Sequence, residues 1–208
     1  MSVHIPSHGG VRTYLPWLLF SFLLLLLVWL EPASAQWLEF HRSDIQEGEY
    51  WRLLTANLVH LSWFHAFGNV GGWLLAAWLL GASAAFWRVL LLVVWCSLWV
   101  GTGLWWFADE LQRYSGFSGA LHGVLLVMPF WSVYYSRRFA IGFAAVLVAK
   151  VLWEQTDWYN DMAMAELIGG RVEARAHLLG LLAGGTALLL VSGWRQFFHP
   201  SGRHAHEH

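Results

Sequence analysis

The chain has 208 residues, of which 58% are hydrophobic and only 12% are charged, and its mean hydropathy is +0.49. Soluble domains carry about 25% charged residues, so this composition indicates an integral membrane protein rather than a soluble domain. The formal net charge is −1 and the basic residues are scattered along the chain, which argues against nucleic acid as a partner.

Six apolar runs have about the length that a bilayer demands of a helix, ~17–25 residues. In chain order they cover residues 15–30, 53–80, 89–107, 118–135, 139–153 and 177–194. They predict an all-α integral membrane fold, a six-transmembrane-helix bundle over residues 15–194. Residues 1–14 are predicted to be a cytoplasmic N-terminus, and residues 195–208 a solvated cytoplasmic tail that contains His204, His206 and His208.

The first run raises the alternative of a signal peptide, because the Pro32-Ala33-Ser34-Ala35 segment after it is similar to a cleavage site. However, the segment before the run carries a single basic residue, Arg12, and the run is at or beyond the long end of a signal-peptide core. We therefore expect the first helix to be retained.

Arginine placement predicts the orientation of the bundle. The pair Arg137-Arg138 lies in a very short connection, where the positive-inside rule counts charges. With a cytoplasmic amino terminus, the inner segments hold six arginines against five outside, and twelve of the thirteen acidic residues lie outside. Both termini are therefore predicted to be cytoplasmic.

Four polar residues within the apolar runs define a candidate active site. They are His65 and Asn69 in the second run, Ser118 at the start of the fourth and His177 at the start of the sixth. In the predicted topology all four lie in the outer half of the membrane. Such residues are expensive to bury there and indicate a functional site.

This set of residues can perform acyl transfer. Ser118 is the candidate nucleophile, and His177 is the base that a weak hydroxyl nucleophile needs. The backbone N–H of Ser118 at a helix start can stabilise an oxyanion, together with His65 and Asn69, which share one helix face. Since no Asp or Glu lies within a run where it could orient His177, the sequence predicts a Ser-His dyad.

Simpler interpretations exist for single pieces of this pattern. Gly116 and Gly119 permit close backbone approach around the serine, but glycines also pack transmembrane helices. His60 is interpreted as an interfacial residue or as a supporting residue of the site, together with His122, Gly116 and Gly119. Cys96 stands alone, so no intrachain disulfide is possible, and it is interpreted as a small apolar residue.

Two other classes of protein stay open at this stage. A haem-binding bundle would use His65, His122 and His177 as axial ligands. A non-catalytic membrane chaperone would be expected to lack the intact serine and histidine pair. No His-Glu-x-x-His motif occurs, so a zinc protease is disfavoured, and neither a metal nor a cofactor is predicted.

Several motifs follow one another between residues 51 and 184. They are Trp51-Arg52, His60, His65, Asn69, Gly116-Phe117-Ser118-Gly119, and Ala176-His177 followed by Gly180 and Gly184. In order and spacing this series resembles the rhomboid family of intramembrane serine proteases. The resemblance implies a serine endopeptidase with Ser118 and His177 as the dyad, and with His65, Asn69 and the Ser118 amide as the oxyanion hole. It also implies that Gly180 and Gly184 let the sixth helix lie close against the fourth.

One departure from the family pattern points to a particular branch. Many rhomboids carry a tyrosine four residues past the serine, where this chain has His122. The His122 ring is expected either to stack on His177 or to act as a second proton-transfer group. This histidine, the short chain and the stretch Lys150-x-x-Trp153-Glu154-Gln155 resemble the rhombosortase branch.

That branch implies bacterial secreted or surface proteins as substrates, with a carboxy-terminal Gly-Gly motif, a hydrophobic helix and a basic end. It implies the bacterial inner membrane as the location, with the active site facing the periplasm. The acyl-enzyme would be resolved by water or by the amine of a lipid head group. An ordinary rhomboid protease that cleaves transmembrane substrates is the alternative.

Lys150 and Glu154 lie four residues apart near the outer end of the fifth run. One interpretation is a snorkelling lysine with a helix-spaced partner. The other is a contact, together with Trp153, for the substrate or for a lipid head group.

Overall fold

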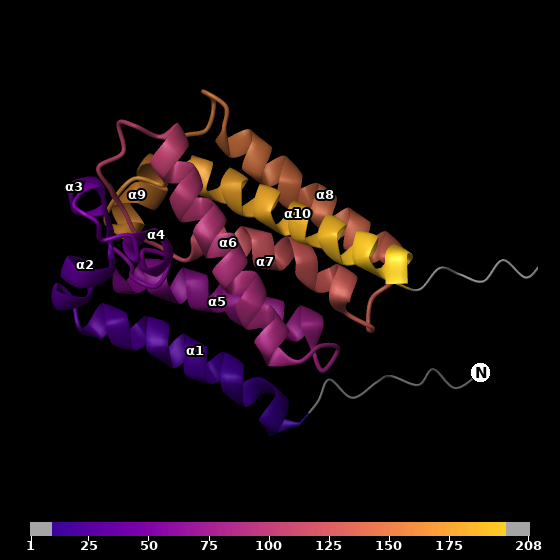
Figure 1. Ribbon diagram of the computed structural model, residues 1–208. Helices are drawn as coiled ribbons and strands as arrows, with labels where there is room; N and C mark the ends of the chain where they lie inside the picture. The colour runs from indigo at the N-terminus through magenta and orange to yellow at the C-terminus, as the bar shows by residue number, and fades with distance from the viewer. Residues whose placement is uncertain (1–9, 199–208) are drawn as a thin grey trace, which may run out of the picture.

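A computed structural model describes residues 10–198 of the chain. The first nine residues of the predicted N-terminal segment, and the tail histidines His204, His206 and His208, lie outside the described residues. Within the described part the chain forms ten helices and a two-stranded sheet (Figure 1). In chain order these are α1 (Val11–Trp29), α2 (Ala33–Leu38), β1 (Phe40–His41), α3 (Arg42–Gln46), α4 (Arg52–Thr55), α5 (Trp63–Leu80), α6 (Phe86–Phe107), β2 (Arg113–Tyr114), α7 (Ser118–Trp131), α8 (Arg137–Glu154), α9 (Met162–Ile168) and α10 (Ala174–Phe198).

The long helices α1, α5, α6, α7, α8 and α10 alternate in direction along the bundle (Figure 1). The short helices α2, α3, α4 and α9 gather at one end of it, which we call the loop end. The two ends of the described chain lie at the opposite end (Figure 1). The carboxyl end of α8 and the amino ends of α7 and α10 therefore meet at the loop end.

Five of the six predicted runs correspond to one long helix each, but the second run is wrong as a continuous helix. After α4 the chain leaves the helical path, because the carbonyl of Ala56 accepts a hydrogen bond from the Gly116 N–H at 3.0 Å. Ser62 then caps α5, since its Oγ accepts from the His65 N–H at 3.2 Å. The irregular stretch 56–62 is thereby tied to the segment that precedes Ser118.

Within residues 10–198, three helices are long and apolar enough to cross a membrane: α1, α6 and the Ala174–Val191 part of α10. α7 is apolar but has only 14 residues. α8 carries Arg137, Arg138, Lys150 and Glu154, and α5 carries His65, Asn69 and several glycines. Length and composition therefore identify fewer membrane-spanning helices than the six that the sequence predicted. The polar side chains of α5 and α8 account for part of this shortfall.

Exposed tryptophans lie near both ends of the long helices. At the loop end they are Trp29, Trp63, Trp106 and Trp153, and at the opposite end Trp78 and Trp87. Tryptophan is enriched at both membrane–water interfaces because its amphipathic ring sits at head-group level. The two belts fit a bundle whose long axis crosses the bilayer.

α1 is part of the packed core. The ring of Trp17 contacts that of Trp73 on α5, with centroids 4.3 Å apart, and the Trp73 indole N–H donates to the Trp17 carbonyl at 3.1 Å. Trp17 and Leu24 are both buried. Loss of the first helix would uncover this face of α5, and its retention stays a prediction.

α7 and α10 pack backbone against backbone through glycines. A methyl group added to Gly180 would overlap the carbonyl oxygen of Gly119, and one added to Gly123 would overlap that of Gly180. Gly184 meets Gly123 in the same way. As the sequence predicted, small residues let these two helices approach closely. Ser118, at the start of α7, is thereby brought beside the first turn of α10.

Gly180→Ala is expected to destabilise the fold by about 1–3 kcal/mol or more, since the added methyl meets backbone that cannot rotate away. The matched control is Gly185→Ala on the same helix, where an added methyl meets no described atom within 4 Å. Thermal unfolding in detergent compares the two variants. Equal midpoints for both would contradict the proposed role of the glycine contact.

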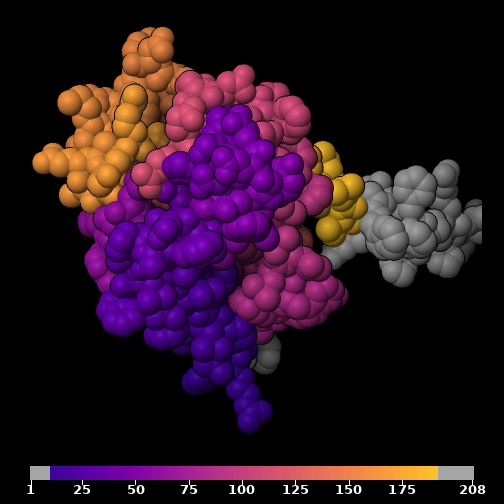
Figure 2. Space-filling view, turned by 60° about the vertical axis from the view of Figure 1, so that its left-hand side comes forward, coloured from indigo at the N-terminus to yellow at the C-terminus, as the bar shows by residue number. Residues whose placement is uncertain are grey.

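At the loop end, buried Arg42 ties the first connection to the end of α6. Its guanidinium donates to four backbone carbonyls, those of Leu104, Trp105, Ala108 and Leu111. β1 then pairs antiparallel with β2, with Phe40 opposite Tyr114. In the space-filling view the purple segment around α2–α4 and the orange segment around α9 cover this end of the bundle (Figure 2). The strand pair positions the short segment that leads into Ser118.

Candidate active site

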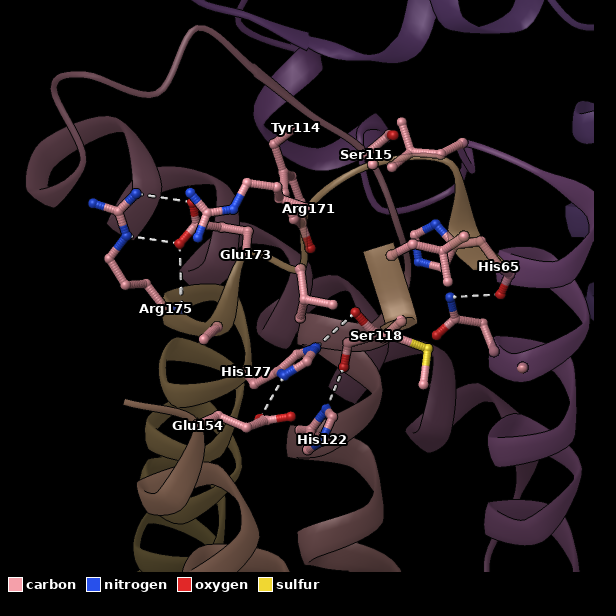
Figure 3. Close-up of a pocket in the computed structure, with 18 of the residues that line it drawn as sticks. His65, Tyr114, Ser115, Ser118, His122, Glu154, Arg171, Glu173, Arg175 and His177 are labelled. Atoms are coloured by element: carbon pink, nitrogen blue, oxygen red, sulfur yellow. Dashed lines mark hydrogen bonds and ion pairs between the residues drawn. The ribbon is translucent and has the colours of Figure 1, made fainter. Parts of the chain in front are cut away.

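Ser118 and His177 face each other across the contact between α7 and α10. Ser118 Oγ lies 3.0 Å from His177 Nε2 (Figure 3). Ser118 is the first residue of its helix, where backbone N–H groups lack intrahelical partners and the helix dipole is positive. His177 is buried in the first turn of α10. The separation is within the reach that a base needs to accept the proton of a serine hydroxyl.

A third side chain, Glu154, joins this pair; the sequence pointed to it only as a partner of Lys150 or a contact for substrate or lipid, and its contact with His177 was missed. It is the last residue of α8, it is buried, and its Oε2 lies 2.8 Å from His177 Nδ1 (Figure 3). The expectation that no acidic residue could orient His177 is therefore wrong. With its Nδ1–H donated to the carboxylate, the ring presents Nε2 as an acceptor for the Ser118 hydroxyl.

Gln155 explains why the end of α8 reaches His177. Its side-chain amide donates to the carbonyl of Val151 at 3.2 Å and to the carbonyl of Ala174 at 2.9 Å. One side chain thus joins the carboxyl end of α8 to the amino end of α10. The neighbouring Glu154 is held against the first turn of α10 as a result.

His122 lies one helical turn after Ser118, and its ring stacks on that of His177. The ring centroids are 4.2 Å apart and the planes differ by 26°. Its Nδ1 lies 2.7 Å from the Ser118 carbonyl oxygen, and its Nε2 lies 2.8 Å from Lys150 Nζ. Because an ammonium group only donates, Nε2 must accept and the ring proton is assigned to Nδ1. Both ring nitrogens are engaged, which favours the stacking interpretation over proton transfer.

Lys150 and Glu154 form the helix-spaced ion pair that the sequence suggested. Lys150 Nζ lies 2.7 Å from Glu154 Oε1. The lysine is nevertheless more than a snorkelling surface residue, because it also contacts His122. Lys150, Trp153 and Glu154 all line the same cavity as Ser118.

Gly116 shapes the segment in front of the serine. Its φ of +131° lies where L side chains are rarely found, and an added methyl would stand 2.6 Å from the ring of His65. Gly119 also lies in a tight position, where a methyl would be 3.0 Å from the Ala176 carbonyl oxygen. The motif glycines therefore permit both the turn into α7 and the approach of α10.

His65 and Asn69, the predicted oxyanion donors, come from α5 and line the cavity that contains Ser118. The Asn69 side-chain amide donates to the carbonyl of His65 at 3.2 Å. His65 packs against Gly116. The ring centroids of His65 and His60 are 5.0 Å apart. The structure thus places both predicted donors in the wall of the cavity that contains Ser118.

His60 is not an interfacial residue. It is buried, with an exposed fraction of 2%, and its Nε2 lies 3.5 Å from the backbone nitrogen of Phe117. The break in the predicted second helix explains the difference, because residue 60 lies in the irregular stretch that packs under the serine segment. His60 therefore supports the backbone just before Ser118.

A cavity of about 1350 Å³ lies over these side chains. Its walls include Ser118, His177 and Lys150, residues 170–173 of the connection between α9 and α10, and the first two residues of α10. Gly169 ends α9 in a left-handed conformation, with φ of +85°. The space is large enough for a peptide segment, since ligand pockets of ~300–1,000 Å³ hold drug-sized molecules.

Of the three histidines in the haem interpretation, the pair His122 and His177 does not have the geometry of two axial ligands. The His122 and His177 rings are nearly parallel and 4.2 Å apart, and their nitrogens contact Ser118, Glu154 and Lys150. They cannot point at one iron from opposite sides in this arrangement.

Ser118, His177 and Glu154 are hydrogen-bonded in series within a helical bundle, an arrangement that resembles the nucleophile, base and carboxylate of serine hydrolases. Residues 47–194 match a family model described as the rhomboid domain. The chain therefore belongs to the rhomboid family, whose members are intramembrane serine proteases. With its apolar helices, this makes it a multi-pass membrane protein. The comparison with curated proteins gives no match.

Proposed function

We propose that the chain is an intramembrane serine endopeptidase of the rhombosortase type, which removes a carboxy-terminal Gly-Gly sorting tail from secreted or surface proteins. The observation that carries the catalytic part is the series Ser118–His177–Glu154 under a large cavity. His122 and Lys150, two of the residues that resemble rhombosortases, support the branch assignment. The His122 ring stacks on His177, and Lys150 contacts His122.

In the acylation step Ser118 Oγ attacks the scissile carbonyl carbon and its proton passes to His177 Nε2. The Glu154 carboxylate stabilises the imidazolium that forms. The oxyanion is held by the Ser118 N–H, with His65 and Asn69 as further donors. His177 then protonates the leaving amine, and the sorting tail departs. Water or the amine of a lipid head group attacks the acyl-enzyme and releases Ser118.

The proposed location is the bacterial inner membrane, with six spans and both termini in the cytoplasm. The loop end would face the periplasm, where the tailed substrates arrive. The two tryptophan belts and the alternating helices support a bundle that spans a membrane with both ends of the described chain on the same side.

Mass spectrometry of a co-expressed Gly-Gly-tailed protein tests the proposal. Loss of the tail with a free carboxy-terminal acid indicates hydrolysis, and an added mass indicates transfer to a lipid amine. An intact tail, alongside cleavage of a generic transmembrane substrate, would instead assign the chain to the ordinary rhomboid proteases.

Asn69→Ala is expected to slow cleavage by at most about 10²–10³-fold, because it removes one of several oxyanion donors. The loss should therefore be smaller than that caused by removal of Ser118. Single-turnover cleavage in liposomes measures the rate. An unchanged rate would take Asn69 out of the oxyanion hole.

His122→Tyr is expected to retain much of the activity, since tyrosine offers a flat ring and a polar tip to the His177 ring. His122→Ala removes the stacked ring and is expected to lose most of it. Cleavage rates at several pH values compare the variants. A tyrosine variant as inactive as the alanine variant would favour proton transfer by His122 instead.

A further inference from the structure

Lys150 is the single lysine of the chain, whose other eleven basic residues are arginines. It lies on α8, one turn before the carboxylate that contacts His177. Its ammonium group is 2.7 Å from Glu154 Oε1 and 2.8 Å from His122 Nε2. Lys150 therefore contacts two side chains that each contact His177, without contacting the reacting groups itself.

The two contacts act on different partners of His177. On one side, the Lys150 ammonium group donates to Oε1 of Glu154, and Oε2 is free to accept from the His177 Nδ1–H. On the other side, it occupies the Nε2 acceptor of His122, so that the opposite nitrogen donates to the Ser118 carbonyl. The orientation of both rings is thus coupled to one ammonium group.

The same place has the ligand set of a metal site. His122, Glu154 and His177 each offer a ligand atom, and these atoms lie within 4.8 Å of one another. Imidazole and carboxylate groups are the ligands that Zn²⁺ and related divalent ions prefer. In the structure Lys150 supplies the positive charge between two of these three side chains. A metal on His177 would compete with its role as a base for Ser118.

We propose that Lys150 is a positioning residue of the proposed protease: its ammonium group holds Glu154 and His122 in their places against His177 and excludes divalent metal ions from that cluster. This inference rests on the proposed function, because it assigns His177 as the base. Beyond that function, the inference states that activity requires a fixed positive charge beside Ser118 and His177.

Labelling of Ser118 by a fluorophosphonate probe tests the positioning role in the full-length protein. The serine oxygen forms the bond to phosphorus, fluoride leaves, and the serine proton passes to His177. Lys150→Met keeps the length of the side chain but removes its charge, and we expect labelling to slow about 10–100-fold, as for loss of other supporting partners. Lys150→Arg keeps the charge and is expected to restore most of the rate. Thermal unfolding shows whether each variant is folded.

Wild-type labelling rates for Lys150→Met would overturn the positioning role. Equal losses in the methionine and arginine variants would also overturn it, because shape rather than charge would then matter. Absence of labelling in the wild type would count against the proposed function itself, and the metal experiment remains decisive for Lys150 in that case.

Metal binding provides a readout that does not depend on activity. Lys150→Ala is expected to bind Co²⁺ with a visible absorption band, and to become sensitive to Zn²⁺ in the labelling assay, with reversal by EDTA. The wild type contains the same tail histidines and serves as the control for binding there. A second substitution, His122→Ala, should remove the band from the Lys150→Ala protein. A band of equal strength in the wild type and in Lys150→Ala would show that Lys150 does not exclude metal.

Discussion

Ser118→Ala and His177→Ala are each expected to abolish processing of a tailed substrate while the protein stays folded and inserted in the membrane. Loss of the nucleophile or the base from such a series costs about 10⁴–10⁶-fold in other serine proteases, so residual cleavage should be undetectable in cells. The reason is geometric, because Ser118 Oγ and His177 Nε2 are 3.0 Å apart and their partners are fixed by the packing of α7 on α10.

Immunoblots of the substrate at equal enzyme level measure this effect. Ser43→Ala is a matched control, because Ser43 is exposed on α3 and remote in sequence from the site. Processing by the Ser118→Ala protein at the rate of that control would remove Ser118 from the mechanism.

Glu154→Gln is expected to lower the turnover rate by about 10²–10⁴-fold, with little change in expression. The amide of glutamine has no negative charge to stabilise an imidazolium. It can also donate to His177 Nδ1, which would leave the ring proton on Nε2 and remove the acceptor that Ser118 needs. Glu154→Asp shortens the side chain and should retain part of the rate if its carboxylate still reaches the ring.

Single-turnover rates separate a triad from the dyad that the sequence predicted. Glu166→Gln on α9 is the matched control, because it removes an exposed carboxylate from the neighbouring connection. A Glu154→Gln rate equal to that of the control would restore the dyad interpretation and reduce Glu154 to a partner of Lys150.

The sequence predicted the parts of this site that carry local signals. Ser118 stands in a glycine-flanked motif at the head of an apolar run, and His177 at the head of another, so their types and positions were sufficient to select them. The close approach of α10 to α7 at Gly180 and Gly184 was implied by the resemblance to the rhomboid family, and the glycine contacts confirm it.

Glu154 could not be selected in the same way, because its role depends on a contact between distant segments. It follows an apolar run at the expected membrane boundary, where an acidic residue usually contacts water. The contact of Glu154 with His177, and the bridge from Gln155 to Ala174 beside it, become visible in the structure alone. The signal available in the sequence was the four-residue spacing from Lys150, which fits a simple ion pair equally well.

The break between α4 and α5 could not be predicted from the sequence for another reason. Residues 56–62 are mainly apolar, so hydropathy alone continues the helix through them. Irregular backbone at membrane depth is tolerated where protein covers it. Here the Gly116 N–H satisfies the carbonyl of Ala56, and the burial of His60 shows how fully the stretch is enclosed.

The Gln155 bridge has a consequence for the order of events in a reaction cycle. Glu154 and its neighbour Gln155 both depend on the contact between the end of α8 and the start of α10. Any outward swing of α8 that widened a passage for a substrate would separate Glu154 from His177. Entry of the substrate and hydrogen bonding between Glu154 and His177 would then exclude each other. The reaction could begin only after the end of α8 had returned to α10.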